Sequence, residues 1–191
     1  MLIGDIGGTT TTVVPGAKYN IVIIADTSGS MARDAATGSA TITTISRINL
    51  LKSSLANLVN QLDDHSSTGG KVNIALVDFA TNVKSVDLNG SATGAPSSVI
   101  DLNSQNSAGV LSAINALTAP SNGGTNYDAA FAKAASEVAA LQTSYSSTQG
   151  YQTITYFLTD GDPTYYINNS TGAVGGNGSS TTARELNEAI E

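Results

Sequence analysis

The chain has 191 residues, no cysteine and a formal net charge of −7. This length suits one domain with a sizeable core and is too short for two large lobes. The absence of cysteine excludes disulfide frameworks and thiolate metal sites. The basic residues are few and scattered, which argues against a nucleic-acid partner because phosphate binding needs clustered Lys and Arg. No apolar run approaches the roughly 20 residues of a membrane span, so we expect no membrane insertion.

The first part of the chain predicts a linker, a strand and a helix. Residues 1–18 are rich in Gly and Thr and are predicted to be a leader or linker before a domain at 19–191. Tyr19–Ala25 (YNIVIIA) is continuously apolar and β-branched and ends at Asp26, which predicts a buried central strand. Arg47–Asp64 carries apolar residues at helical spacing and predicts a helix.

The middle of the chain predicts a hairpin and a loop. Lys71–Ala80 (KVNIALVDFA) is a strand pattern, and the alternation that begins at Val83 predicts a second strand only a few residues later. A connection this short permits a hairpin, so the second strand should be antiparallel and at an edge of the sheet. Residues 89–106 are predicted to be a polar loop, and the apolar residues around Val110 predict a short helix after it, with Asn106 available as its cap.

The last part predicts a helix over Tyr127–Leu141, a strand over Tyr151–Thr159, a Gly-rich loop over Tyr166–Thr182 and a helix from Ala183. Strands that alternate with helices predict an α/β fold. We expect a doubly wound, mostly parallel sheet with helices on both faces and one antiparallel edge strand. No strand follows the last helix, so we expect the C-terminal strand and helix of such a fold to be absent from this chain.

Polar residues gather where the predicted strands and helices meet: Asp26, Ser28, Ser30, Thr125 and Asp160. In doubly wound sheets ligands bind beyond the carboxyl ends of the strands, where the winding direction reverses. A strand order of 3-2-1-4 would bring these loops together. Two carboxylates and three hydroxyls offer only oxygen, which favours a divalent cation, with Mg²⁺ first and Ca²⁺ or Mn²⁺ as alternatives. An open coordination position would accept an acidic group of a ligand.

The same residues resemble the metal-ion-dependent adhesion site of von Willebrand factor A domains. The matching strings are DTSGSM at 26–31, GGTNY at 123–127 and TDGDP at 159–163. The resemblance implies a Rossmann-like fold in which Ser28, Ser30 and Thr125 touch the metal. It also implies that Asp26 and Asp160 hold the metal directly or through water.

The resemblance implies metal-dependent adhesion and no enzymatic activity. A low-charge, cysteine-free, Ser/Thr-rich chain of this family is similar to modules of large, secreted bacterial surface adhesins, such as the repeats-in-toxin (RTX) type. We therefore expect an extracellular or cell-surface location. The expected partners are a protein or glycan ligand that offers an acidic group, and neighbouring adhesin domains. The alternative is a structural scaffold or spacer whose metal only staples loops.

Enzymatic alternatives rest on weaker signals. The string GDIGGT at 4–9 resembles the first phosphate-binding motif of the glucokinase and actin-like ATPases, but no long strand precedes it. Asp26-x-Ser28 resembles the nucleophile loop of haloacid-dehalogenase-like phosphatases, with Ser28 where an acid/base carboxylate should stand. His65, the only histidine, is predicted to be solvated or at a helix end. Residues close to the motifs are expected at the rim of the site: Tyr127, Asp162, Tyr165 and Tyr166.

Overall fold

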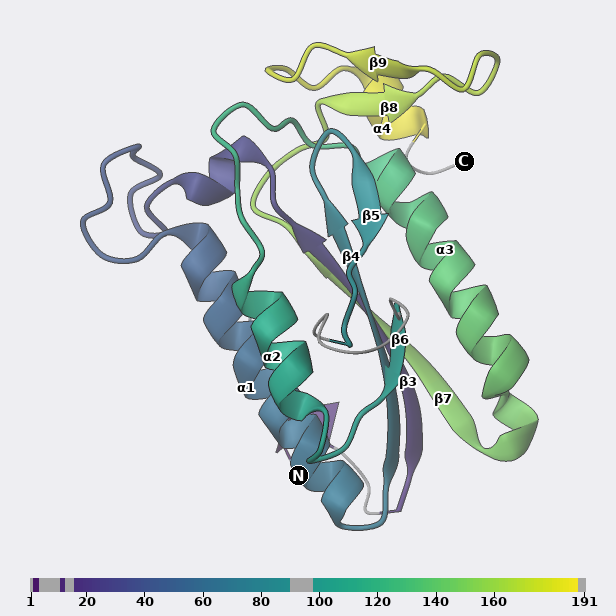
Figure 1. Cartoon of the computed structure of the whole chain (residues 1–191). Helices are drawn as coiled ribbons and strands as arrows, with labels where there is room; N and C mark the ends of the chain where they lie inside the picture. The colour runs from purple at the N-terminus through teal and green to yellow at the C-terminus, as the bar shows by residue number, and fades with distance from the viewer. Residues whose placement is uncertain (1, 4–10, 13–15, 90–97, 189–191) are drawn as a thin grey trace.

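A computed structural model describes residues 2–3, 11–12, 16–89 and 98–188 (Figure 1). Its strands are β1 (Leu2–Ile3), β2 (Thr11–Thr12), β3 (Lys18–Asp26), β4 (Lys71–Phe79), β5 (Val83–Ser85), β6 (Val99–Asp101), β7 (Tyr151–Leu158), β8 (Tyr165–Ile167) and β9 (Val174–Gly176). Its helices are α1 (Arg47–Ser67), α2 (Ser107–Asn115), α3 (Tyr127–Ser144) and α4 (Ala183–Glu188), with short 3₁₀ turns η1 (Gly29–Ala32) and η2 (Ser147–Gln149). The phosphate-loop-like string at 4–9 lies outside the described residues.

The central sheet has the order β5-β4-β3-β7, which is the predicted 3-2-1-4 arrangement. Strand β3 pairs in parallel with both β4 and β7, so the first and last predicted strands are neighbours. The predicted antiparallel edge is confirmed, and two short strands share it, because β5 and β6 both pair with β4. Within the described ranges, no strand pairs with the outer side of β7.

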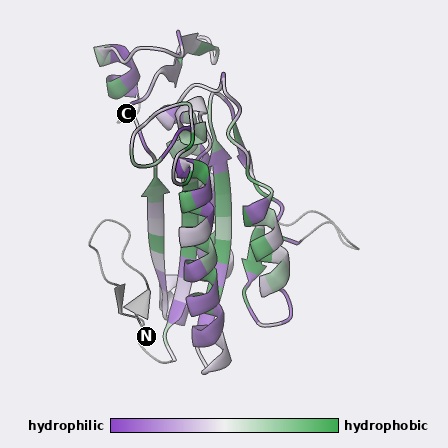
Figure 2. Ribbon diagram, turned by 90° about the vertical axis from the view of Figure 1, so that its left-hand side faces the viewer, coloured by the Kyte–Doolittle hydropathy of each residue, from purple (hydrophilic) through white to green (hydrophobic). Residues whose placement is uncertain are grey.

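Helices cover both faces of this sheet, as predicted. Helices α1 and α2 lie on one face and α3 lies on the other (Figure 1). Side chains of a strand point alternately to its two faces. In β3, Ile21 and Ile23 therefore pack toward α1, whereas Val22 and Ile24 pack toward α3. The central strands are accordingly the most hydrophobic part of the ribbon (Figure 2).

Two predicted loops contain strands. Strand β6 lies inside the predicted loop 89–106, and the β8–β9 hairpin begins one residue before the predicted loop 166–182 and otherwise lies within it. All three are three-residue strands with little apolar patterning of their own, so their pairing partners decide their conformation. The hairpin and α4 lie above the end of the sheet where β3 and β7 finish (Figure 1). No helix in the described part of the chain has the length and hydropathy of a membrane span.

The environment of His65 differs in part from the prediction. It lies near the end of α1, as predicted, but its side chain is buried rather than solvated. Its Nε2 atom lies 2.9 Å from the backbone oxygen of Ala17, and its ring packs against that of Tyr19, with 5.5 Å between the centroids. These contacts fasten the start of β3 to α1, a structural role.

Candidate metal centre

The strand register places two of the predicted site loops at the same level. Ala25 of β3 is paired with Leu158 of β7, so Asp26 and Thr159 come next on adjacent strands. The chain then turns away from both strand ends, into η1 after β3 and into the loop before β8 after β7. Because parallel strands end at one edge of the sheet, residues 130 or more positions apart become neighbours.

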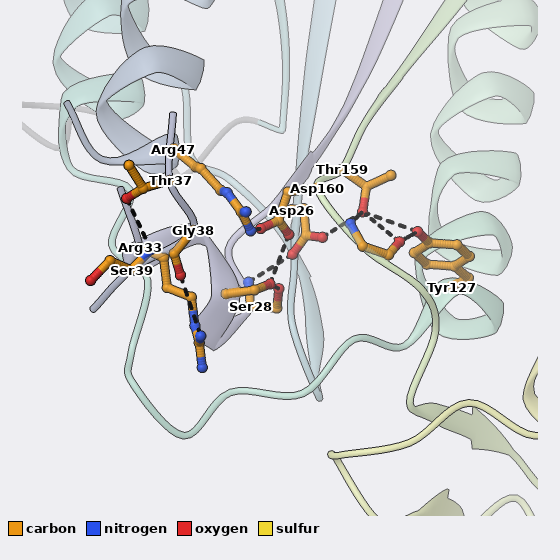
Figure 3. A network of polar contacts seen from close by, with 12 residues as sticks. Asp26, Ser28, Arg33, Thr37, Gly38, Ser39, Arg47, Tyr127, Thr159 and Asp160 are labelled. Atoms are coloured by element: carbon orange, nitrogen blue, oxygen red, sulfur yellow. Dashed lines mark hydrogen bonds and ion pairs between the residues drawn. The ribbon is translucent and has the colours of Figure 1, made fainter. Parts of the chain in front are cut away.

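Four of the five predicted site residues are joined by hydrogen bonds (Figure 3). The backbone N–H of Ser28 donates to Oδ1 of Asp26 at 2.7 Å. The hydroxyls of Ser28 and Ser30 lie 3.0 Å apart, and the Ser30 hydroxyl donates to Oδ1 of Asp160 at 2.7 Å. The alternation of Asp26, Ser28 and Ser30 therefore points three oxygen-bearing side chains into one region.

The fifth residue, Thr125, lies in the loop before α3 and lines the same cleft as Ser30. Its backbone is fixed to Thr164, since each residue accepts from the other's N–H, through the Thr164 hydroxyl at 2.9 Å and the Thr125 carbonyl at 2.7 Å. Asn126, rather than Thr125, caps α3 by accepting from Ala129 N–H at 3.1 Å. Thr125 is 5% exposed and lines the cleft, and its hydroxyl makes no hydrogen bond among the described residues, so its oxygen is available to a ligand in the cleft.

Gly29 permits the close approach of two site loops. Its N–H donates to the carbonyl of Gly123 at 2.7 Å, which ties the DTSGS loop to the GGT loop. A Cβ atom on Gly29 would lie 2.9 Å from the backbone oxygen of Ser121, closer than real side chains come. The glycine is thus required by backbone packing. A cleft of about 1120 Å³ opens above these loops, and Ser30 and Thr125 are among its lining residues.

Asp26 is fully buried, and burial raises its pKa above the ordinary value. Hydrogen bonds from Thr159 and Ser28 lower the pKa, and the nearby charge of Asp160 raises it. The Thr159 hydroxyl donates to Oδ2 of Asp26 at 2.6 Å, and the Tyr127 hydroxyl lies 3.0 Å from that of Thr159 (Figure 3). A buried carboxylate held beside a second carboxylate is an arrangement that a cation would stabilise.

Sequence reasoning missed Arg47 as a site residue. Arg47 is the first residue of α1, and its guanidinium donates to Oδ2 of Asp160 in an ion pair (Figure 3). No local pattern marks this contact, because its partners lie 113 residues apart. Thr159 belongs to the TDGDP string, but the string alone indicates no role for it. Of the expected rim residues, Asp162 and Tyr165 line the cleft, Tyr127 contacts Thr159, and Tyr166 instead packs against Arg184.

A buried carboxylate, Asp34, orders the loop after η1, and Ala40 of that loop lines the cleft. Asp34 accepts three hydrogen bonds at Oδ1, from Ala36 and Thr37, and four at Oδ2, from Thr43 and Thr44. The backbone donors among them lie 2.8–3.0 Å away. These bonds hold the pKa of Asp34 far below its ordinary value. The loop that connects η1 to α1 is therefore ordered around one side chain.

The donor set fits a hard dication. In the described part of the chain no three His, Cys, Asp or Glu residues cluster as a metal site would need, so any metal here depends on hydroxyls. The cluster offers carboxylates from Asp26 and Asp160, two serine hydroxyls and the unpartnered Thr125 hydroxyl. All are oxygen, the ligand that Mg²⁺, Mn²⁺ and Ca²⁺ prefer.

Comparisons with known proteins identify the fold of this chain. Residues 21–162 match the model of the von Willebrand factor type A domain. The PilB minor pilin from Streptococcus sanguinis is similar in structure, with a TM-score of 0.60 and 18% identity over 84% of this chain and 34% of that chain. The vWF domain of the type V pili tip protein Mfa5 from Porphyromonas gingivalis gives a TM-score of 0.52 and 20% identity over 82% of this chain and 41% of that one. At these identities the likeness shows the fold. No curated protein sequence matched.

Proposed function

Because the chain belongs to the von Willebrand factor type A domain family, we propose that it binds a divalent cation through Asp26, Ser28, Ser30, Thr125 and Asp160 and uses that cation for adhesion. The observation that carries the proposal is the hydrogen-bonded chain from Asp26 through the two serines to Asp160, with Thr125 lining the same cleft as Ser30. Mg²⁺ suits this set best, since it is commonly held by one or two carboxylates and completes its shell with other oxygens.

The cleft supports an adhesive role for the cation. A cation at these residues would lie at the floor of an open cleft lined mainly by Ser, Thr, Asn and Gly. An acidic group of a protein or glycan could enter the cleft and complete the coordination. None of the cleft-lining residues is a histidine or cysteine, so neither a histidine-activated hydroxyl nor a thiolate nucleophile is present there, which favours a binding module over an enzyme.

The proposed setting is the bacterial cell surface. The structurally similar proteins are a minor pilin and a pilus tip protein, and this chain spans about a third of the first and two fifths of the domain structure of the second. We infer that the domain functions beside neighbouring adhesin domains in a longer extracellular protein. The low-charge, cysteine-free composition favours a secreted adhesin of the repeats-in-toxin type as that protein.

Calorimetry with Mg²⁺, Mn²⁺ and Ca²⁺ tests the metal directly. The native protein should bind at least one of these ions, and Ser28→Ala should weaken binding by roughly tenfold or more, since one oxygen ligand is lost. Ser53→Ala is the matched control, because the Ser53 hydroxyl only donates to Asn49 within α1. Equal affinities of the native protein and Ser28→Ala would remove the central claim.

The scaffold alternative predicts a different outcome. The site loops are already connected by direct hydrogen bonds, such as Gly29 to Gly123 and Ser30 to Asp160, which favours a metal that serves a ligand over one that only holds loops. EDTA or Asp26→Ala should therefore abolish binding to cells or to an acidic ligand while far-ultraviolet circular dichroism stays native. Loss of the fold on metal removal, with no ligand found, would favour the scaffold.

A further inference from the structure

Asp160 is engaged on both of its oxygens. Oδ1 accepts from the Ser30 hydroxyl at 2.7 Å, and Oδ2 pairs with the guanidinium of Arg47 (Figure 3). The ion pair is well shielded, since the Arg47 side chain is 28% exposed and that of Asp160 only 11%. Arg47 thus stands beside the proposed metal site, on a carboxylate that the family resemblance assigns to the metal.

The start of α1 fixes the position of Arg47. Its backbone N–H donates to the carbonyl of Arg33 at 2.9 Å, and the preceding residue Ser46 caps the helix by accepting from Asn49 N–H at 3.4 Å. Asp34 orders the loop that leads to this helix. A guanidinium is protonated at every physiological pH, so the site holds a permanent positive charge.

That charge changes the electrostatic balance of the site. The carboxylates of Asp26 and Asp160 would neutralise a dication, but Arg47 already neutralises one of them. Two charged residues line the cleft above the site, Arg33 and Asp162, and their opposite signs offset each other. With a dication bound, the site therefore has one positive charge in excess. We propose that Arg47 sets this excess charge and so makes the loaded site select an anionic group over water or a neutral group.

This inference rests on the proposed function and makes two opposite predictions for one substitution. Arg47 repels a dication, so its removal should tighten binding of the metal alone. Arg47 attracts an anion at the loaded site, so its removal should weaken binding of the anion. If Arg47 only positioned Asp160, its removal would weaken binding of the metal, because the released carboxylate would bind the ion less well.

Calorimetry with Mg²⁺ alone measures the first effect. We expect Arg47→Ala to bind Mg²⁺ roughly fivefold to tenfold tighter than the native protein, as for a like charge acting across a partly exposed site. Arg47→Lys keeps the charge and should restore the native affinity within about twofold. Arg184→Ala is the matched control, since Arg184 lies over the ring of Tyr166 and pairs with Glu188 rather than with a residue of the proposed site. If Arg47→Ala does not fold, Arg47→Gln takes its place, because it also removes the charge but keeps a hydrogen-bond donor.

Water-proton relaxation of Mn²⁺-loaded protein measures the second effect, with acetate as the probe anion. Acetate should displace metal-bound water from the native protein, and Arg47→Ala should need at least about fivefold more acetate. Arg47→Lys should behave as the native protein. If Arg47→Ala and Arg47→Gln bind Mg²⁺ as the native protein does, or more weakly, the inference about Arg47 is wrong and the proposed function still stands. Failure of the native protein to bind Mg²⁺ or Mn²⁺ would instead overturn the proposed function.

Discussion

The hydroxyl of Thr159, the first residue after β7, donates a hydrogen bond of 2.6 Å to Oδ2 of Asp26, the last residue of β3. This bond joins the two strand ends that meet at the site. It also lowers the pKa of Asp26, which burial raises. The side chain beyond a strand end thus decides how readily the buried carboxylate stays ionised.

Replacing Thr159 by valine should weaken metal binding. The variant keeps the shape of the side chain but removes the donor, so the pKa of Asp26 should rise further and its charge should be less well stabilised. We expect the free energy of unfolding to fall by about 1–3 kcal/mol, the cost of an unsatisfied buried acceptor, and the Mg²⁺ affinity to fall with it. Urea denaturation and calorimetry measure the two effects.

Tyr127→Phe is the control for that variant. It removes the outer hydroxyl, which contacts Thr159 and Gly161, but leaves the bond from Thr159 to Asp26 in place. Its effect on Mg²⁺ affinity should be smaller than that of Thr159→Val. A larger effect would mean that Tyr127, rather than Thr159, stabilises the carboxylate.

Gly29→Ala should separate the two loops that Gly29 brings together. The added Cβ would meet backbone oxygens of Ser121 at 2.9 Å and of Gly123 at 3.1 Å, and backbone cannot move aside as a flexible side chain can. We expect a loss of about 1–3 kcal/mol in unfolding free energy and weaker Mg²⁺ binding. Gly161→Ala is the matched control at the same site, since nothing lies within 4 Å of its added Cβ. Native behaviour of Gly29→Ala would contradict the close approach.

Asp34 should make stability depend on acidity. Its pKa is lowered in the folded protein, whereas the unfolded chain has an ordinary value near 3.9. Its stabilising contribution is therefore complete above the unfolded pKa and is lost as the pH falls below about 4 toward the folded pKa. Asp34→Asn should be less stable at pH 7 and lose less stability than the native protein between pH 5 and pH 2. Urea denaturation across this range tests it, and equal slopes for the two proteins would exclude the assignment.

Metal should raise the thermal stability of the native protein. A ligand that binds only the folded state at a hundred times its Kd stabilises by about 2.7 kcal/mol, which for a chain of this size raises Tm by roughly 5–10 °C. Ser28→Ala should show little of this shift at the same Mg²⁺ concentration, and EDTA should reverse it. An identical Tm with and without the ion, at concentrations that saturate binding, would show that the site does not couple to folding.

The parts of the fold that were predictable are those whose own residues decide their structure. Tyr19–Ala25 is apolar on both faces, and a strand that is buried on both faces must be central in a parallel sheet. The carboxyl end of this strand places Asp26, and its parallel neighbour β7 places Asp160 at the same edge of the sheet. The site was thus accessible from sequence because it stands at the ends of the most strongly patterned strands.

The unpredicted parts depend on partners far along the chain. Strand β6 exists through its pairing with Asn73–Ala75 of β4, and a three-residue stretch within a polar segment carries no sign of that partner. The β8–β9 hairpin pairs two tyrosines with glycines, a weak strand pattern. The sequence around His65 indicates an exposed polar helix end. Only the fold shows that its side chain contacts the backbone oxygen of Ala17 and the ring of Tyr19. Arg47 similarly lacks any local sign of Asp160.

The two parallel ladders of β3 bear on how the domain would resist force. Strand β3 is paired at nine positions with β4 and at eight with β7, and Asp26 stands at its carboxyl end. A pull on a ligand held at Asp26 and resisted at Lys18 would run along the strand axis. Because the covalent backbone of β3 joins these two residues, it would carry the pull itself, and the hydrogen bonds of both ladders would hold the strand in place without having to open. A ligand bound at this end of β3 would therefore be anchored along a strand that is held on both sides.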